Sequence, residues 1–180
     1  MKRKKIVLGV CASIAAYRAC DIINTLKKQN IDVVVCLTKD AKHFITPLTL
    51  QTLSGERVFI DMFKPIKEWD PLHISLAKQA DLILVAPSSA DIISKVASGA
   101  CNDLLSCTIA STEAPVLFAP AMNNIMYKNK IVQENISKLK KMGYEFVGPE
   151  KGHLACGTKA IGHIADTDDI VRQVKSLLKK

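Results

Sequence analysis

The chain has 180 residues, 48% of them hydrophobic, and a formal net charge of +8. This length and composition predict one folded domain, residues 1–180, with a buried core, and exclude a disordered chain. No apolar run approaches the roughly 20 residues that a membrane helix needs. The basic residues are not interleaved with aromatic residues, and no nucleic-acid motif occurs, so neither nucleic acid nor a membrane is expected as the main partner.

The N-terminus is basic, like the start of a signal peptide, but the apolar segment after it is short and soon reaches Tyr17 and Arg18. We therefore expect a strand and a helix there, and a cytoplasmic protein. Six cysteines occur without a CxxC pair, which favours neither a disulfide framework nor a zinc site, and no metal is predicted. Cys20, Cys36 and Cys107 lie in apolar patterns and are expected to be buried thiols.

Apolar runs and amphipathic segments alternate along the chain. The expected strands cover 5–10, 31–37, 57–60, 82–86, 115–118 and, as the last strand, 144–147. The expected helices cover 13–29, 39–45, 47–53, 90–97, 103–111, 130–142 and a terminal helix from about 168. The strands are apolar on both faces, which is typical of a parallel sheet covered by helices. We predict an α/β fold with a single doubly wound parallel sheet, Rossmann-like or flavodoxin-like, and helices on both faces.

The stretch 119–127, Ala-Pro-Ala-Met-Asn-Asn-Ile-Met-Tyr, follows a strand expected to be buried. In an open parallel sheet, ligands bind beyond the carboxyl ends of the strands. Met122 offers soft apolar surface and Asn123 an amide with donors and an acceptor. From these residues alone, a turn in which the Asn merely caps a helix is an equally good interpretation.

Small residues follow two other expected strands. The turn 9–16 has one glycine and no lysine, so it lacks both the GxGxxG dinucleotide pattern and the P-loop. With Ser13 at a helix N-terminus, this turn can hold one phosphate, which fits a mononucleotide such as FMN better than NAD. The turn 87–91 is similar and would let a planar ring approach the backbone. Ordinary helix capping is the alternative in both turns.

Two further segments carry reactive side chains. His73 precedes a short apolar pattern; a lone histidine is more often structural, yet imidazole is the commonest general base near neutral pH. The loop 152–157 contains His153 and Cys156. A thiol beside glycine in a loop is typical of a working residue. Two ligands without a second pair do not predict a metal site.

Taken together, these segments resemble the flavin-containing cysteine decarboxylases, and among them the phosphopantothenoylcysteine decarboxylases of coenzyme A biosynthesis. The resemblance runs over nearly the whole chain. It rests on the order of the segments together with the Leu-Ala-Cys-Gly loop; the segments are 13–17, 37–48, 73–76, 86–91, 120–127 and 152–157.

The resemblance implies FMN-dependent decarboxylation of 4′-phosphopantothenoylcysteine to 4′-phosphopantetheine through a thioaldehyde and an enethiolate. It implies a homo-oligomer, a trimer or dodecamer, with active sites between subunits. The chain ends after one terminal helix, so it is expected to be monofunctional, without a fused synthetase domain. The implied catalytic residues are His73 as base for thiol oxidation, Asn123 as the residue that orients the substrate, and Cys156 as proton donor.

The same resemblance implies the binding residues. Those for the cofactor are Ala12, Ser13, Ile14, Thr38, Phe44, Ser88, Ser89, Ala90, Asp91 and Ala121. Those for the phosphorylated substrate are Met122, Asn123, Leu154, Ala155 and Cys156, with Met122 packed near the reacting atoms.

Four positions depart from the pattern of the family. Asp91 replaces Asn, Tyr127 replaces Trp, Ala160 replaces Gly and His163 replaces Arg. The replacement of Arg by His163 is expected to weaken substrate anchoring, because histidine is mostly uncharged at neutral pH.

Other functions share this fold. A peptidyl-cysteine decarboxylase would use the same FMN chemistry, whereas a flavin prenyltransferase, a generic FMN electron carrier or a non-catalytic regulatory subunit would not. The loop 152–157 favours the small phosphorylated substrate. The joint presence of His73, Asn123 and Cys156 favours an enzyme over a binding module.

Overall fold

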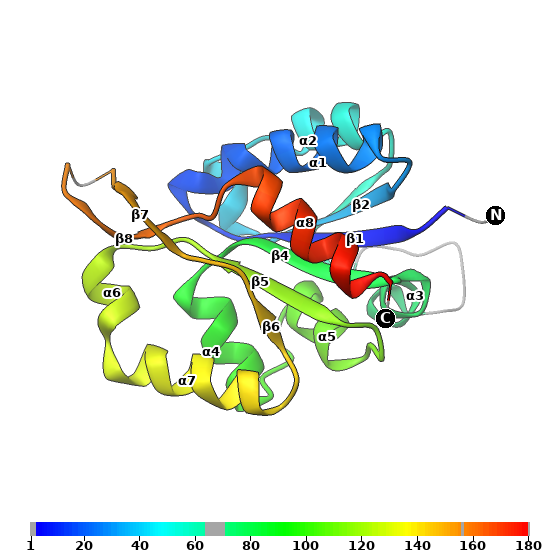
Figure 1. Ribbon diagram of the computed structural model, residues 1–180. Coiled ribbons are helices and arrows are strands. Elements are labelled where there is room, and N and C mark those ends of the chain that lie inside the picture. The colour runs from blue at the N-terminus through cyan, green and yellow to red at the C-terminus, as the bar shows by residue number, and fades with distance from the viewer. Residues whose placement is uncertain (1–2, 64–70, 156, 180) are drawn as a thin grey trace.

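The computed structural model describes residues 3–63, 71–155 and 157–179. Six parallel strands form one sheet in the order β3-β2-β1-β4-β5-β6 (Figure 1). Their bounds are β1 Lys5–Val10, β2 Asp32–Leu37, β3 Val58–Phe59, β4 Leu82–Ser88, β5 Val116–Pro120 and β6 Glu145–Phe146. Two more strands, β7 Glu150–His153 and β8 Lys159–His163, form a separate antiparallel hairpin.

Helices cover both faces of the sheet, α1, α2 and α8 on one face and α3, α4, α5 and α7 on the other (Figure 1). The helices are η1 Ile14–Tyr17, α1 Arg18–Lys28, η2 Asp40–His43, α2 Pro47–Ser54, α3 Leu72–Gln79, α4 Ala90–Ser98, α5 Leu104–Ala110, α6 Asn124–Lys128, α7 Lys130–Lys141 and α8 Thr167–Leu177, of which η1 and η2 are 3₁₀ turns. No helix in these described ranges is long and apolar enough to cross a membrane.

The core lies on both sides of the sheet because successive strand residues point to opposite faces. In β1, Ile6 and Leu8 pack against one set of helices, and Val7 packs against the other. The central strand β4 is buried along its whole length. Strands buried on both faces must be apolar throughout, which is how the sequence reads. The predicted doubly wound α/β fold is confirmed.

The sheet order places a switch point between β1 and β4. The chain runs outward from β1 to β2 and β3, then returns to β4 on the other side of β1 and continues to β5 and β6. Loops that leave β1 and β4 therefore diverge and open a crevice at the carboxyl edge of the sheet. The backbone N–H of Cys11 donates to the carbonyl of Pro87 at 3.2 Å, which joins the loop after β1 to the carboxyl end of β4.

The structure corrects several expectations. Residues 144–147 do not form the last strand, because the Gly-rich segment after them folds into β7 and β8. The expected helix over 39–45 is only the turn η2, and the expected helix over 13–29 begins as the turn η1. Cys36 and Cys107 are buried as expected, but Cys20 is only partly buried.

Candidate active site

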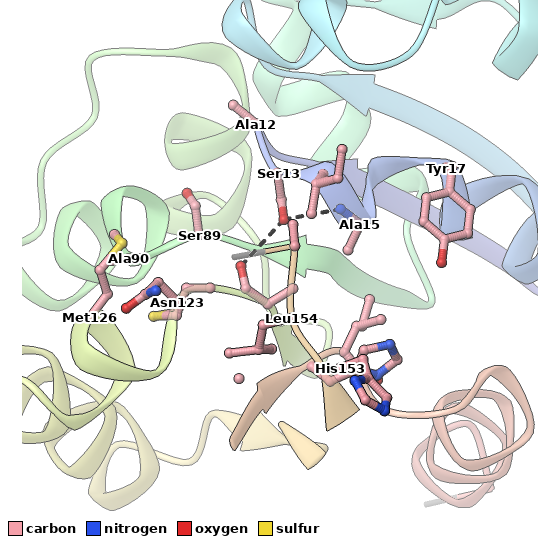
Figure 2. Close-up of a pocket in the computed structure, with 17 residues that line it drawn as sticks. Ala12, Ser13, Ala15, Tyr17, Ser89, Ala90, Asn123, Met126, His153 and Leu154 are labelled. Atoms are coloured by element: carbon pink, nitrogen blue, oxygen red, sulfur yellow. Dashed lines mark hydrogen bonds between the residues drawn. The ribbon is translucent and has the colours of Figure 1, made fainter. Parts of the chain in front are cut away.

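A cavity of about 490 Å³ opens at the carboxyl edge of the sheet, between the loops that follow β1, β4 and β5 and the β7–β8 hairpin (Figure 2). Its lining residues are Ala12, Ser13, Ile14, Ala15, Tyr17, Ser89, Ala90, Ala121, Met122, Asn123, Met126, His153, Leu154, Ala155, Gly162, His163 and Ile164. We call the lining residues of 12–17, 89–90 and 121–126 the core wall, and those of 153–155 and 162–164 the hairpin wall.

Two serines organise the core wall. Ser13 has extended backbone dihedrals and caps η1: its Oγ accepts from the backbone N–H of Ala15 at 3.3 Å and donates to the carbonyl of Ala121 at 3.4 Å (Figure 2). Ser89 caps α4, its Oγ accepting from the N–H of Ile92 at 3.4 Å. Helix N-termini leave backbone N–H groups without intrahelical partners, so this wall presents donors that suit an anion.

Asn123 both caps a helix and lines the cavity. Its Oδ1 accepts from the N–H of Ile125 at 2.8 Å, at the start of α6. The expected helix-capping role is therefore confirmed, and it does not exclude a ligand-binding role. Met122 and Met126 border the cavity on either side of this cap.

The hairpin wall docks on the core wall through backbone atoms. The N–H of Met122 donates to the carbonyl of Gly162 at 3.1 Å. A Cβ at position 162 would collide with the carbonyl oxygen of Met122, and Gly162 has φ +134, a conformation that residues with side chains rarely adopt. Only glycine fits this contact. At the tip of the hairpin, the N–H of Gly157 donates to the carbonyl of Leu154 at 2.9 Å, which brings Leu154 and Ala155 to the cavity.

A second cavity of about 410 Å³ adjoins the first and shares Ala12, Ser89, Ala90 and Met126 with it. Thr38 and Asp91 line this second cavity.

Lys95 also lines the second cavity and pairs with Asp91 at 2.8 Å and with Asp103 at 2.9 Å. Burial disfavours the charged form of Asp103, but the Ser106 N–H and the Lys95 ammonium outweigh it and lower the pKa of Asp103. The negative charge at Asp91, where the family pattern has Asn, is thus compensated within the chain.

Three predicted site residues line neither cavity. His73 lies in the first turn of α3, which packs against α5 at the far end of the molecule from the hairpin (Figure 1). Its Nδ1 is buried and has no hydrogen-bond partner among the described residues. Phe44 caps η2 and is 47% exposed, whereas Ser88 is fully buried at the end of β4.

The remaining predicted residues are brought together, except Cys156, which lies outside the described residues. The first cavity is lined by Ala12, Ser13, Ile14, Ser89, Ala90, Ala121, Met122, Asn123, Leu154 and Ala155. The second is lined by Ala12, Thr38, Ser89, Ala90 and Asp91. Their individual roles stay predictions.

Met126, in the singled-out stretch 119–127, lines the cavity, whereas sequence reasoning did not place Tyr17 or His163 among the site residues. Tyr17 fits the apolar spacing of an α-helix, but it belongs to the 3₁₀ turn η1 and is 56% exposed. His163 entered the sequence analysis as a departure from the family pattern that affects substrate anchoring, without being placed among the binding residues. The available signal was its position in the same Gly-rich segment as His153.

Comparison with known proteins places this geometry in a family. The model of the family described as Flavoprotein matches residues 1–179. A probable phosphopantothenoylcysteine decarboxylase of Streptococcus mutans is 44% identical, covering 97% of this chain and 99% of that protein. The coenzyme A biosynthesis bifunctional protein CoaBC of Borreliella burgdorferi is 43% identical over 95% of this chain, which spans only 44% of the length of that relative.

Comparison with solved structures supports the same family. A Cys-to-Ser mutant of a PPC decarboxylase, complexed with pantothenoylaminoethenethiol, has a TM-score of 0.90 at 27% identity and covers 99% of this chain and 100% of its own. The FMN binding protein AtHal3 has a TM-score of 0.83 at 28% identity, covering 97% and 96% of the two chains. This chain therefore belongs to the flavoprotein family, and the resemblance to flavin-containing cysteine decarboxylases is confirmed.

Proposed function

We propose that this protein is an FMN-dependent phosphopantothenoylcysteine decarboxylase, a carboxy-lyase that forms 4′-phosphopantetheine in coenzyme A biosynthesis. One observation carries the proposal: the Met122–Asn123 cap and the Leu154–Ala155 segment, far apart in sequence, border one cavity. A binding module or an electron carrier does not need this pairing. The names of the Streptococcus mutans relative and of the PPC decarboxylase structure support the substrate.

The residues at the carboxyl edge fit FMN. The hydroxyl of Ser88 is buried without a hydrogen-bond partner in the described chain, directly before the capping residue Ser89. Small side chains at Ala12 and Ala90 leave the backbone open where the two cavities meet. Ser13, Ser89 and their helix N-termini would hold the phosphate, and Thr38, directly after β2, would contact the cofactor. Bound there, FMN would supply two-electron oxidation of the substrate thiol and the later return of those electrons, without an external reductant.

The residues of the chain then serve the decarboxylation itself. Direct loss of CO2 from a cysteine carboxylate would leave an unstabilised carbanion, whereas a thioaldehyde accepts the electron pair and gives an enethiolate. Asn123 would orient the carboxylate or amide of the substrate, and Met122 would exclude water beside the reacting carbon. Cys156 would donate the proton that the enethiolate carbon needs. His73 would accept the thiol proton at the start.

We further propose a homo-oligomer, a trimer or dodecamer, in which His73 reaches the cavity of a neighbouring copy. In the single chain His73 lines neither cavity, so a catalytic role requires a second subunit. Large apolar side chains exposed near the carboxyl edge supply the surface; they are Ile14, Phe44, Leu48, Ile125 and Met126. Light scattering coupled to size exclusion distinguishes a trimer from a dodecamer. A cytoplasmic location and the single domain over residues 1–180 are part of the same proposal.

The test is an absorbance scan of the purified protein for FMN, followed by CO2 release from 4′-phosphopantothenoylcysteine. We expect a yellow protein that releases CO2 from this substrate but not from a peptide ending in cysteine. Turnover of the peptide alone would favour a peptidyl-cysteine decarboxylase. A colourless protein that cannot be loaded with FMN would contradict the proposal.

The Cys156→Ser variant tests the assigned proton donor. We expect it to release CO2 and to accumulate an oxidised aminoenethiol product, because protonation and reduction of the enethiolate then fail. Formation of 4′-phosphopantetheine at the full rate would remove Cys156 from the mechanism.

A further inference from the structure

The first cavity has two chemically different ends. Figure 2 shows Asn123, Met126 and Ala90 toward one end and Tyr17 and His153 toward the other. Ala90 and Met126 also border the second cavity, whereas Tyr17 and His153 do not. If the reacting cysteine end of the substrate lies at Asn123, as proposed above, the phosphate end points toward Tyr17 and His153 (Figure 2).

Among the described residues that line this cavity there is no lysine, arginine, aspartate or glutamate. Of the described side chains that line the cavity, only His153 and His163 can acquire a positive charge. A phosphate at this end of the cavity therefore meets imidazoles, the Tyr17 hydroxyl and backbone atoms. Histidine changes its charge between pH 5 and 8, unlike the arginine that the family pattern has at position 163.

The orientation of the His163 ring is fixed by two contacts. Its Nδ1 lies 2.8 Å from the carbonyl oxygen of Ile164. A carbonyl only accepts, so Nδ1 carries the proton in this contact. The ring also covers Gly152, where an added Cβ would lie 2.7 Å from the ring carbon Cγ. The neutral ring therefore has an unprotonated Nε2, which is an acceptor, and only the cation offers a donor there.

This fixed tautomer determines which partner His163 can bind. A phosphate dianion presents only acceptors, so it repels the lone pair of a neutral Nε2 and binds the protonated form. We propose that His163, assisted by His153, is the phosphate-binding group of the substrate cavity and takes up a proton when the substrate binds. This inference rests on the proposed function and adds the residue that recognises the phosphate.

The charged groups around His163 come from several elements. On the neighbouring strand β7, Glu150 is its register partner, and Glu150 Oε1 accepts from the N–H of Asp166 at 3.4 Å. From α1, Arg18 pairs with Asp166 at 3.1 Å and with Asp21 at 4.0 Å. The other ionisable groups nearby are Tyr17 of η1, His153 and Lys151 of β7, Lys159 of β8, and Lys128 of α6, which packs against β8. Because Arg18 is engaged by carboxylates, the ionisable groups that line the cavity itself remain the histidines and Tyr17.

The test is calorimetric titration of the FMN-loaded protein with 4′-phosphopantetheine at pH 6.5 and 8.0, in buffers of different ionisation enthalpy. In the wild type we expect the Kd to rise about tenfold between these pH values, because one linked proton changes affinity by at most tenfold per pH unit. We also expect net proton uptake on binding at pH 8.0.

Three variants and one substrate analogue test whether His163 causes the pH dependence of binding. His163→Arg should bind at both pH values with less than about a twofold change in Kd and no proton uptake, and His163→Gln should bind weakly at both. His43→Gln, a change at an exposed histidine of η2, should keep the wild-type pH dependence. Pantetheine, which lacks the phosphate, should show no pH dependence. Retention of the FMN absorbance shows that each variant is folded.

A flat wild-type Kd, or a wild-type pH dependence that persists in His163→Arg, overturns the assignment to His163. Pantetheine with the same pH dependence overturns the assignment to phosphate. CO2 release by the wild type at pH 6.5 separates the two hypotheses. If CO2 is released while the Kd is flat, only the His163 proposal fails; if neither CO2 release nor 4′-phosphopantetheine binding occurs, both fail.

Discussion

The two walls of the cavity are built by different means. The core wall consists of loops at the ends of β1, β4 and β5, strands that are buried almost throughout. The hairpin wall is a two-stranded ribbon outside the six-stranded sheet, and partly buried and exposed residues alternate along β7. An isolated hairpin is marginally stable, so this wall depends on its contact with Met122. The difference predicts that changes in the core wall alter stability, whereas changes in the hairpin wall alter turnover.

The largest effect is expected from Gly162→Ala. The added Cβ would collide with the carbonyl of Met122, so the hairpin must shift away from the core wall. We expect CO2 release to fall at least 100-fold, since misplacement of catalytic groups by about 1 Å has effects of that size. Bound FMN should be retained, as measured by absorbance. Gly143→Ala, at φ +91 with no atom within 4 Å of the added Cβ, is the matched control for backbone strain and should keep its activity.

The second prediction concerns the strand beneath the core wall. A Cβ at Gly9 would lie 2.6 Å from Cδ1 of Leu105, so Gly9→Ala overpacks the core. We expect the free energy of unfolding in urea to fall by about 1–3 kcal/mol. CO2 release per folded molecule should stay near the wild-type value. Addition of Leu105→Val should restore part of the stability. An unchanged unfolding midpoint for Gly9→Ala would contradict the difference between the walls.

The third prediction is alkaline unfolding. Burial raises the pKa of the Cys11 thiol from its ordinary value of 9.0 to about 12. The unfolded chain then loses this proton at a lower pH than the folded chain does. The contribution of this thiol to the free energy of unfolding is fully present below pH 9. It is lost between pH 9 and 12, at about 1.4 kcal/mol per pH unit. Urea unfolding of the reduced protein at pH 8, 9 and 10 measures this slope.

In Cys11→Ala, the free energy of unfolding should fall less steeply with pH above pH 9, by about 1.4 kcal/mol per pH unit. Cys101→Ala removes an exposed thiol and should leave the slope unchanged. If both variants retain the wild-type slope, Cys11 is not the linked group. Burial also raises the pKa of Cys36, so some alkaline loss should remain in Cys11→Ala.

The smallest effect is expected from Ser89→Ala. Loss of the cap on α4 should lower the stability of the FMN-free protein by about 1 kcal/mol. Because Ser89 also lines both cavities, we expect the Kd for FMN, measured by fluorescence, to rise about tenfold. Asn129→Ala removes a comparable cap from α7 at a residue that lines neither cavity, and should lower stability without changing the Kd for FMN. Equal FMN affinities in the two variants would argue against Ser89 as a cofactor ligand.

Sequence patterns predicted the core wall far better than the hairpin wall. Apolar runs mark β1, β2, β4 and β5, and the small residues after them mark the turns that carry Ser13 and Ser89. The strand β7, Glu-Lys-Gly-His, buries no apolar face in the core and therefore has no hydrophobic periodicity. Pairing between β7 and β8 is set by backbone hydrogen bonds, which sequence periodicity does not report.

Sequence patterns also did not predict which segments, far apart in the chain, lie together in space. The chain order did not reveal that His73 lies away from the cavity, since the position of α3 depends on its packing against α5. For Asn123 the sequence allowed a cap or a ligand-binding residue, and the structure shows that one side chain can cap the helix and face the cavity. Resemblance to a family supplied the roles that local patterns could not.

The link between Met122 and Gly162 has a consequence for evolution. Both the hydrogen bond and the close contact involve backbone atoms of Met122, and neither involves its side chain. A substitution at residue 122 can therefore reshape the surface of the cavity while the hairpin stays docked. Position 162, in contrast, accepts only glycine, because a Cβ there would collide with the carbonyl oxygen of Met122. Proteins that evolve from this chain can therefore change their substrate by substitution of residue 122 while the backbone contact at residue 162 stays the same.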